Sequence, residues 1–255
     1  MHQQIMVWLE MAGAALRRSL DSDLLIEEKK SPRDLVTHMD KQIERLLSAN
    51  IKEYYPDHRI LGEEGIESKP QDTNGIIWVI DPIDGTMNFI KQKRHFGIMI
   101  GIFEDGIPIA GYIYDVVANE LYYGIVGDGA YCNNLPMDPL EIKNLHDGLL
   151  CVNLVTSNPQ QPGIKKLIDT SLGVRSYGAA ALEIIAVLRG EVAAYLSNGL
   201  HPWDFAAGYA LCSSMGMKVT TLDGKKPNIL ERSSIVFAPE HIHQEIITTL
   251  NNLEK

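Results

Sequence analysis

The spacing of apolar residues predicts two long helices in the first quarter of the chain. From Ile5 to Leu20, apolar side chains recur every three or four residues, as they do in a helix with one buried face. The same spacing runs from Thr37 to Tyr54, and the Tyr55-Pro56-Asp57 sequence that follows is a stop signal. We therefore expect two amphipathic helices before the first long strand.

The middle of the chain has patterns typical of β-strands. Arg59 to Leu61 predicts a short strand, and Ile76 to Ile80 is a continuous apolar run of the buried type. The polar segment from Glu67 to Gly75 lies between them and predicts a mobile loop. Three more strands are expected, joined by turn signals that suit an antiparallel meander: His95 to Phe103, Pro108 to Tyr114 and Glu120 to Ile125.

The second half of the chain alternates between helix and strand patterns. Helices are expected at Gln161 to Leu172, Ala179 to Arg189, Trp203 to Met215 and Glu240 to Leu253. Short strands are expected at Leu150 to Leu154, Val174 to Ser176, Val192 to Leu196, Lys218 to Leu222 and Ile235 to Ala238. This order predicts an α+β lobe followed by an α/β lobe, packed in layers. We expect one domain over residues 1–255, with possible sub-lobes at 1–140 and 141–255.

Composition and charge narrow the class of protein. With 255 residues and 45% hydrophobic residues, the chain can bury a large core and is expected to be one compact unit. The net charge of −10 argues against nucleic acid as the main partner. A small phosphorylated metabolite stays compatible with that charge, because a bound divalent cation can invert the local field.

The cysteines and the first helix indicate the cellular compartment in which the protein is expected. Cys132, Cys151 and Cys212 are an odd, widely spaced set without a CxxC motif, which argues against disulfides and zinc and favours a reducing cytoplasm. The first helix carries charged residues and does not resemble a secretory signal. No apolar run is long enough to span a bilayer, so no membrane partner is expected.

The clearest chemical motif runs from Asp81 to Phe89, directly after the buried strand. Its two carboxylates, Asp81 and Asp84, lie three residues apart where the strand is expected to end and the chain to turn. Gly85 permits a positive φ or a close backbone approach, and the amides of Gly85 and Thr86 can begin a short helix that faces an anion. Carboxylates are ligands for Mg²⁺, and two such ions can stabilise the attacking and leaving oxygens of a phosphoryl transfer.

Three further acidic residues are candidates for the same site. Glu63 follows the short strand in Gly62-Glu63-Glu64, Asp204 begins the helix at Trp203-Asp204, and Asp40 lies on the second amphipathic helix. Each has an ordinary alternative when taken alone: Glu63 as a solvated loop residue, Asp204 as an acid at a helix N-terminus, and Asp40 as an exposed helix acid. The sequence pattern of each segment by itself leaves both possibilities open.

Taken together and in this order, the four segments resemble the inositol monophosphatase family. The matching strings are Asp34-Leu35-Val36-Thr37 with Asp40, Gly62-Glu63-Glu64, the nine residues from Asp81 to Phe89, and Trp203-Asp204 with Ala206-Ala207-Gly208. The resemblance covers nearly the whole chain. The nine-residue string is also shared by fructose-1,6-bisphosphatases, nucleotide 3′-phosphatases and NADP phosphatases, so it does not separate these activities.

The resemblance implies a layered αβαβα sandwich of α+β and α/β character, a lithium-sensitive enzyme, usually a homodimer, and two to three Mg²⁺ ions. Glu63, Asp81 and the carbonyl of Ile83 would hold the first ion. Asp81, Asp84 and Asp204 would hold the second, and a third, weaker ion would lie near Glu63.

The resemblance also implies catalytic and substrate-binding roles. Thr86 and Asp40 match the pair that orients and deprotonates a water, which attacks phosphorus in line without a covalent enzyme intermediate. Lys29 or Lys30 matches a basic residue on a mobile loop. The implied catalytic set is Asp40, Glu63, Asp84 and Thr86. The implied phosphate and substrate contacts are Asp84, Gly85, Thr86, Ala180, Ser197 and Asp204.

One position departs from the family pattern. Where many inositol phosphatases have a glutamate that contacts sugar hydroxyls, this chain has Ser197. We therefore expect hydrolysis of inositol monophosphate, with a broader range that can include the 2′-phosphate of NADP. NADP or fructose 1,6-bisphosphate as the main substrate is the alternative. A regulatory protein-binding role is a further hypothesis, disfavoured because Asp84, Thr86 and Asp204 are all present.

Overall fold

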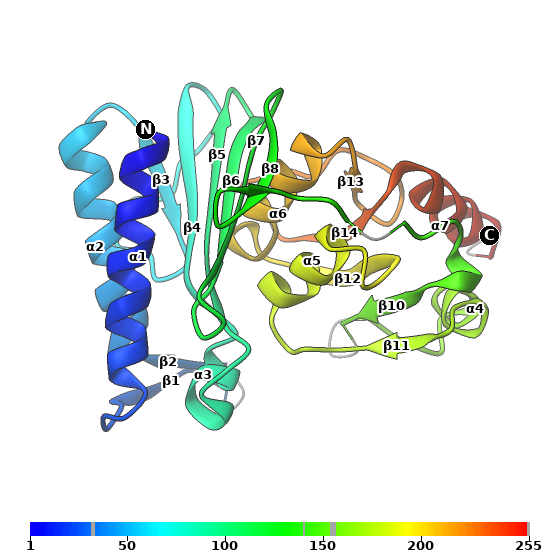
Figure 1. Ribbon diagram of the computed structural model, residues 1–255, viewed down its shortest axis with the longest axis horizontal. Helices are drawn as coiled ribbons and strands as arrows, with labels where there is room; N and C mark the ends of the chain where they lie inside the picture. Colours follow the sequence, from blue (N-terminus) through cyan, green and yellow to red (C-terminus); the bar gives the residue numbers. More distant parts are fainter. Residues whose placement is uncertain (32–33, 140, 154–156, 254–255) are drawn as a thin grey trace.

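Two β-sheets and three helical layers alternate through the molecule, as the computed structural model shows for residues 1–31, 34–139, 141–153 and 157–253 (Figure 1). Helices α1 (His2–Ser19) and α2 (His38–Tyr54) cover the outer face of a seven-stranded sheet. Helices α5 (Ala180–Leu188) and α6 (Pro202–Ser214) lie between the two sheets. Helices α4 (Pro162–Thr170) and α7 (Glu240–Leu253) cover the far side of a five-stranded sheet. The predicted αβαβα arrangement is confirmed.

The seven-stranded sheet follows the order of the chain. Its strands are β3 (Arg59–Gly62), β4 (Ile76–Asp84), β5 (Gly97–Glu104), β6 (Ile107–Asp115), β7 (Glu120–Ile125), β8 (Gly129–Cys132) and β9 (Leu135–Pro136). The first two strands are parallel and every later neighbour is antiparallel, which confirms the predicted meander.

The five-stranded sheet has the order β11-β10-β12-β14-β13. Its strands are β10 (Leu149–Val152), β11 (Gly173–Arg175), β12 (Ala194–Leu200), β13 (Lys218–Thr220) and β14 (Ser233–Ala238). β10 pairs in parallel with both of its neighbours, while β14 is antiparallel to β12 and β13. Leu154, the expected end of the β10 strand, lies outside the described residues. The remaining elements are α3 (Thr86–Gln92), the 3₁₀ turn η1 (Leu145–Asp147) and an antiparallel pair of strands, β1 (Ile26–Ser31) and β2 (Asp34–Thr37).

Two expectations were wrong in detail. Lys29 and Lys30 belong to strand β1 and not to a loop. The segment from 26 to 31 is almost entirely charged or polar, so no apolar alternation reveals it, and its backbone pairing with β2 makes it a strand. The buried strand β4 also continues to Asp84 instead of ending at Ile80. Its pairing with β5 shifts register between Asp81 and Asp84, where Pro82 has no N–H to donate.

Small residues hold α6 against the seven-stranded sheet. A Cβ at Gly111 of β6 would lie 2.1 Å from the Ala207 carbonyl oxygen, and a Cβ at Gly101 of β5 would lie 2.7 Å from the Ala206 carbonyl carbon. Only glycine allows this approach of strand and helix backbones. The contact brings the start of α6, and therefore Asp204, against the sheet that contains β4.

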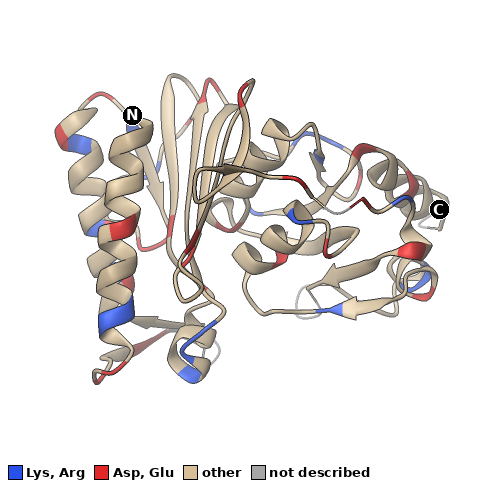
Figure 2. Cartoon of the chain, viewed as in Figure 1, with Lys and Arg blue, Asp and Glu red and all other residues tan. Residues whose placement is uncertain are grey.

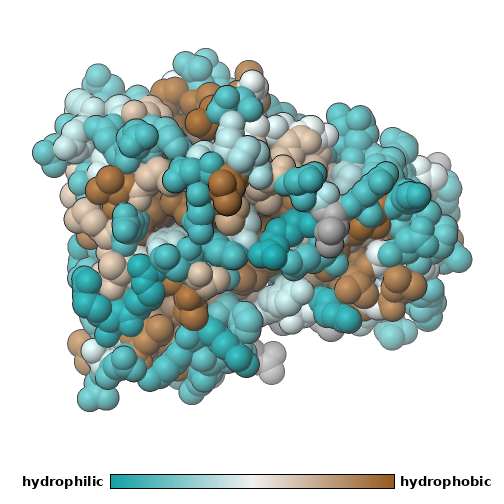
Figure 3. Space-filling model, in the orientation of Figure 1, coloured by the Kyte–Doolittle hydropathy of each residue, from teal (hydrophilic) through white to brown (hydrophobic). Residues whose placement is uncertain are grey.

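The surface shows no single dominant patch in the views drawn. Lysine and arginine are distributed over separate helices and loops and do not follow one stripe (Figure 2). On the face drawn in Figure 3, apolar side chains form separate patches among hydrophilic ones, and the outline is hollowed between the parts that carry α3 and β11. In the described ranges, no helix combines the length and the apolar composition that crossing a membrane requires.

Candidate active site

Three carboxylates from distant parts of the chain meet between the two sheets. Asp81 and Asp84 come from the irregular end of β4, and Asp204 is the third residue of α6. One oxygen from each lies within 4.8 Å of the others, a spacing that suits a shared metal ion. Asp204 also accepts a hydrogen bond from the His201 N–H at 2.7 Å, which fixes its direction at the helix start. Asp204 is thus a helix-capping acid and a member of this group at once.

Burial and mutual repulsion make these carboxylates unfavourable as free anions. Burial raises the pKa of Asp81 well above its ordinary value, and the charges of Glu63 and Asp84 raise it further. Burial likewise raises the pKa of Asp204, with Asp84 and Glu63 adding to the effect. Burial raises the pKa of Asp84 to about 7, although the α5 amides, including Ala181 N–H at 2.6 Å, oppose the shift. A divalent cation with hard oxygen ligands would relieve this repulsion, so these residues fit Mg²⁺.

Glu63 lies beside this group and outside its tight cluster. It follows β3, and its N–H donates to the Ile80 carbonyl of β4 at 3.2 Å. The three-oxygen cluster does not include it, yet its charge raises the pKa values of Asp81 and Asp204. The hydrogen bond to Ile80, the residue before Asp81, places the backbone of Glu63 beside the end of β4.

Thr86 and Asp40 form a hydrogen-bonded pair at the edge of the cluster. Thr86 Oγ1 lies 3.1 Å from Asp40 Oδ1 and 3.0 Å from the Ile83 carbonyl oxygen, and its single proton can serve only one of them at a time. The other oxygen of Asp40 accepts the Thr37 N–H and hydroxyl, each at 2.7 Å. Asp40 is only 1% exposed, and burial raises its pKa. It is therefore a fixed buried acid and not an exposed helix acid.

Gly85, between Asp84 and Thr86, occupies a position where a larger residue would not fit. Gly85 has φ 87° and stands immediately before α3, so the chain turns there in a left-handed conformation. A Cβ at this position would lie 2.8 Å from Ala179 Cβ, at the start of α5. Gly85 thus lets the N-terminal turns of two helices approach each other next to Asp84.

A cavity of about 290 Å³ opens beside the carboxylates. Its lining residues are Asp84, Asn153, Ser176, Gly178, Ala179, Ala180, Glu183, Tyr195, Leu200 and Asp204. Ala180, a predicted substrate contact, lies in this wall. Ser197 is fully buried in β12 and is not among the lining residues. The positions of the Lys29 and Lys30 side chains lie outside what the structure describes.

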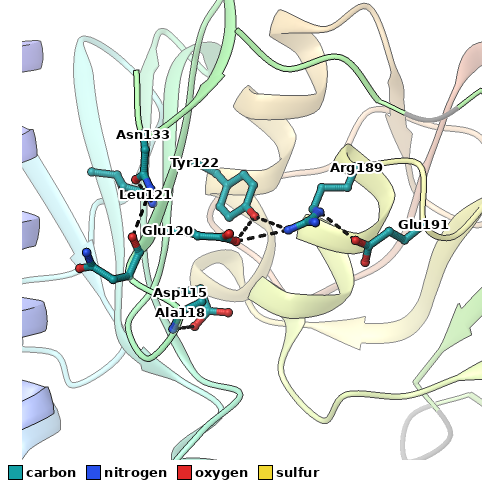
Figure 4. Close-up of polar contacts among 9 residues, drawn as sticks. Asp115, Ala118, Glu120, Leu121, Tyr122, Asn133, Arg189 and Glu191 are labelled. Carbon is teal, nitrogen blue, oxygen red and sulfur yellow. Dashed lines mark hydrogen bonds and ion pairs between the residues drawn. The ribbon is translucent and has the colours of Figure 1, made fainter. Parts of the chain in front are cut away.

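A larger cavity, of about 430 Å³, lies elsewhere around Arg189. The Arg189 guanidinium donates to Glu120 at 3.3 Å and to the Tyr122 hydroxyl at 3.1 Å, and it pairs with Glu191 at 2.8 Å (Figure 4). Here Glu120 and Glu191 are both paired with Arg189, whereas burial raises the pKa values of Asp84 and Asp204 at the smaller cavity. We therefore place the chemistry at the smaller cavity.

The sequence patterns missed several cavity residues: Asn153, Ser176, Glu183 and Tyr195. Of these, Glu183 had a visible signal, since it is the single charged residue in the otherwise apolar helix Ala180–Leu188, all of which is buried. Its Oε1 accepts N–H groups from Tyr177 at 2.7 Å and Gly178 at 3.3 Å. The other three residues lie in segments whose local pattern is unremarkable, and only the packing of the two sheets brings them together.

Comparison with known proteins agrees with this geometry. The family model for the inositol monophosphatase family matches residues 3–255. The chain is 43% identical to the inositol-1-monophosphatase of Bacillus subtilis (strain 168), over 94% of this chain and 92% of that protein. It is 30% identical to the fructose-1,6-bisphosphatase/inositol-1-monophosphatase of Thermotoga maritima, over 89% of this chain and 87% of that protein. A crystal structure of an IMPase/NADP phosphatase complexed with Mg²⁺ and phosphate matches with a TM-score of 0.89 and 31% identity, over 98% of this chain and 94% of that one.

Proposed function

The chain belongs to the inositol monophosphatase family and is a phosphatase, and we propose that it is a Mg²⁺-dependent phosphomonoesterase acting mainly on inositol monophosphate. We include the 2′-phosphate of NADP in its range. The observation that carries this proposal is the position of the buried Asp81 and Asp84 with the half-buried Asp204, beside the Thr86–Asp40 pair and at the wall of a cavity.

The residues that would hold Mg²⁺ are Asp81, Asp84, Asp204, Glu63 and the carbonyl of Ile83. They are hard oxygen donors, and burial together with neighbouring carboxylates raises the pKa values of Asp81 and Asp204, an effect that a cation would oppose. When bound, two to three Mg²⁺ ions would neutralise the phosphate and lower the pKa of water. The donor set contains no thiolate or imidazole, which is in keeping with Mg²⁺ and not with zinc.

The protein groups would supply orientation and proton transfer. Thr86 Oγ1 would accept a proton from the attacking water while passing its own proton to Asp40 Oδ1. Asp40 is suited to receive it because burial raises its pKa, and its second oxygen is already fixed by Thr37. The amides of Gly85 and Thr86 would hold the phosphate oxygens. These groups act before and during attack and form no covalent bond to phosphorus.

The cavity favours a leaving group of modest size. A volume of about 290 Å³ is near the lower end for small-molecule sites, which suits an inositol ring and requires a dinucleotide to extend outside. Asn153 and Ser176 offer polar groups to ring hydroxyls. Ser197 is buried and supplies no carboxylate to this wall, so selectivity for one polyol is expected to be weak. NADP or fructose 1,6-bisphosphate as the main substrate is the second candidate, favoured by this same lack of a charged anchor.

The proposal is tested by phosphate release from four compounds, with Mg²⁺ and with EDTA: inositol 1-phosphate, NADP, fructose 1,6-bisphosphate and adenosine 3′,5′-bisphosphate. The control is Asp84→Asn, which is expected to lose at least about 1,000-fold in kcat, equivalent to about 4 kcal/mol. Fastest release from inositol 1-phosphate supports the proposed order of substrates, and fastest release from NADP reverses it. A folded protein that binds Mg²⁺ and releases no phosphate from any of them would instead favour a regulatory binding role.

Two further properties are proposed on family resemblance alone. We expect a homodimer, which sedimentation velocity at micromolar concentration will distinguish from a monomer of 28.4 kDa. We also expect inhibition by lithium, which a titration of LiCl against a KCl control at equal ionic strength will reveal. A single species at monomer mass, or equal effects of the two salts, would remove the corresponding proposal.

A further inference from the structure

A buried glutamate on α2 is bonded to the loop that carries Glu63. Glu44 lies one helical turn after Asp40 and is 0% exposed. Glu64 N–H donates to its Oε2 at 2.7 Å, and Ile66 N–H donates to its Oε1 at 2.9 Å. Both carboxylate oxygens therefore bind the backbone of this loop. Glu44 belongs neither to the three-aspartate cluster nor to the proton-transfer pair.

The loop has a shape that matches this carboxylate. A Cβ at Gly62 would lie 2.3 Å from both Cδ and Oε1 of Glu44, so the carboxylate packs directly against the loop backbone. Gly65 has φ 68° and lets the chain turn between the two amides that Glu44 binds. The two glycines and the glutamate thus form one unit, in which a side chain at position 62 would displace the carboxylate.

The backbone of Glu63 is held on both sides. The Glu63 N–H donates to the Ile80 carbonyl of β4 at 3.2 Å, and the N–H of the next residue, Glu64, donates to Glu44. The charge of Glu63 raises the pKa values of Asp81 and Asp204, so the carboxylates repel one another when no cation is present. A loop without internal support would move away from such repulsion. The bonds to Glu44 oppose that movement.

We propose that Glu44 is a positioning residue, which holds Glu63 in its metal-binding position before Mg²⁺ arrives. The inference rests on the proposed function, because it takes Glu63 and the aspartates as the groups that hold the ion. Groups that orient metal ligands typically change metal affinity by 10- to 100-fold when they are removed. Because Glu44 is fully buried and is not among the residues that line the cavity, we expect it to act on ion binding and not on the chemical step.

The test is Glu44→Gln, measured by calorimetric titration of the metal-free protein with Mg²⁺. Glutamine keeps the volume but has only one acceptor oxygen, so its NH₂ group faces one of the two loop amides without a bond. We expect Mg²⁺ affinity to fall roughly 10-fold or more. The Mg²⁺ concentration for half-maximal phosphate release should rise by the same factor, with kcat at saturating Mg²⁺ within about 3-fold of the parent.

Two controls on the same helix separate positioning from general loss of stability. Ser48 is buried one turn after Glu44, and its hydroxyl has no hydrogen-bond partner among the described residues, so Ser48→Ala removes a polar group without touching the loop. Leu47→Ala lowers the melting temperature through a core cavity and also leaves the loop bonds intact. Both should bind Mg²⁺ with the parent affinity. Equal loss of affinity in Leu47→Ala and Glu44→Gln would overturn the inference.

Gly62→Ala tests the same unit if Glu44→Gln does not fold. Its methyl group displaces the Glu44 carboxylate without changing any charge, and it is expected to weaken Mg²⁺ binding to a similar degree. Parent-like affinity in a folded Glu44→Gln or Gly62→Ala variant would refute the positioning role. Because calorimetry reads ion binding directly, tight Mg²⁺ binding without phosphate release would count against the proposed function alone.

Discussion

The two halves of the molecule contribute different chemistry to the candidate site. Before residue 90, the elements on and around the seven-stranded sheet supply Asp81, Asp84, Glu63 and the Thr86–Asp40 pair. After residue 150, the elements around the five-stranded sheet supply the cavity wall with Asn153, Ser176 and Tyr195, and α6 adds one carboxylate, Asp204.

The difference lies in how tightly each half is constrained. Asp40 accepts three hydrogen bonds, counting both oxygens, and the Glu63 loop is bonded to β4 and to α2. The part of the cavity wall that comes from the second half is uncharged except for Glu183 and Asp204, and the position of the expected sugar-binding acid is a serine. On the proposed function, this difference assigns the reaction mainly to the first half together with Asp204, and the choice of substrate to the cavity wall of the second half.

Apart from the loss of the proposed metal ligand Asp84, the largest effect is expected from removing the hydroxyl of the proton-transfer pair. Thr86→Val keeps the shape of the side chain but cannot relay a proton to Asp40, so kcat should fall about 100- to 1,000-fold while KM changes little. Steady-state phosphate release measures this. Thr86→Ser, which retains a hydroxyl, is the control and should keep most activity. A Thr86→Val enzyme within about 10-fold of the parent would show that the first half does not work as described.

A smaller effect is expected where α6 joins the two halves. In Gly111→Ala the new methyl group would lie 2.1 Å from the Ala207 carbonyl oxygen, so helix and strand must separate. We expect the free energy of unfolding to fall by about 1–3 kcal/mol, measured by urea denaturation. The displaced α6 should also weaken Mg²⁺ binding through Asp204. If stability falls while Mg²⁺ affinity is unchanged, the packing of α6 on the seven-stranded sheet does not determine the position of Asp204 in the metal site.

The stability of the metal-free protein should depend on pH in an unusual direction. The pKa of an ordinary aspartate is 3.8, and burial raises the pKa of Asp84 in the folded protein to about 7. Between about pH 3.8 and pH 7, the folded state therefore binds more protons than the unfolded state. The contribution is fully present below about pH 3.8 and is lost as pH rises through about 7, and on the order of 2 kcal/mol of that loss falls between pH 5.5 and 8.5. Thermal melting in EDTA from pH 5.5 to 8.5 measures it.

Mg²⁺ should reverse this trend, because binding requires the deprotonated carboxylates. The rise in melting temperature on adding Mg²⁺ is therefore expected to grow with pH. Asp84→Asn mimics the neutral carboxyl group and should flatten the pH dependence in EDTA. A metal-free parent that gains stability between pH 6 and 8 would contradict the shift assigned to the aspartates.

The smallest effect is expected on the cavity wall. Asn153→Ala removes a partly exposed amide that can bond a substrate hydroxyl, so KM should rise about 3- to 10-fold with kcat nearly unchanged. Asn50 on α2 is the control, because it lies away from the cavity and bonds to the Leu46 carbonyl. When Asn153→Ala is assayed with the four compounds, their ranking by rate of phosphate release should differ from that of the parent. A large loss of kcat would instead place Asn153 in the chemical step.

Much of this arrangement could be predicted from local pattern. The helix over Thr37 to Tyr54 begins and ends within one residue of its expected bounds, because its stop signal and its apolar spacing are both local. The strand β4 was expected to end at Ile80 and continues to Asp84, since its bulged pairing with β5 depends on a partner strand. The strand containing Lys29 and Lys30 was missed for the same reason, as only pairing with β2 identifies it.

By itself, the sequence determined the helices and most strands, the layered class and the identity of the acidic residues. These follow from side-chain period, turn residues and short motifs, which act over a few positions along the chain. Only the tertiary structure decided that Asp204 lies within 4.8 Å of Asp81 and Asp84, that Glu44 binds the Glu63 loop, and that Ser197 is buried away from the cavity. All of these facts depend on contacts between segments far apart in the chain, such as Gly101 and Gly111 against α6 and Gly62 against Glu44, which no local pattern reveals.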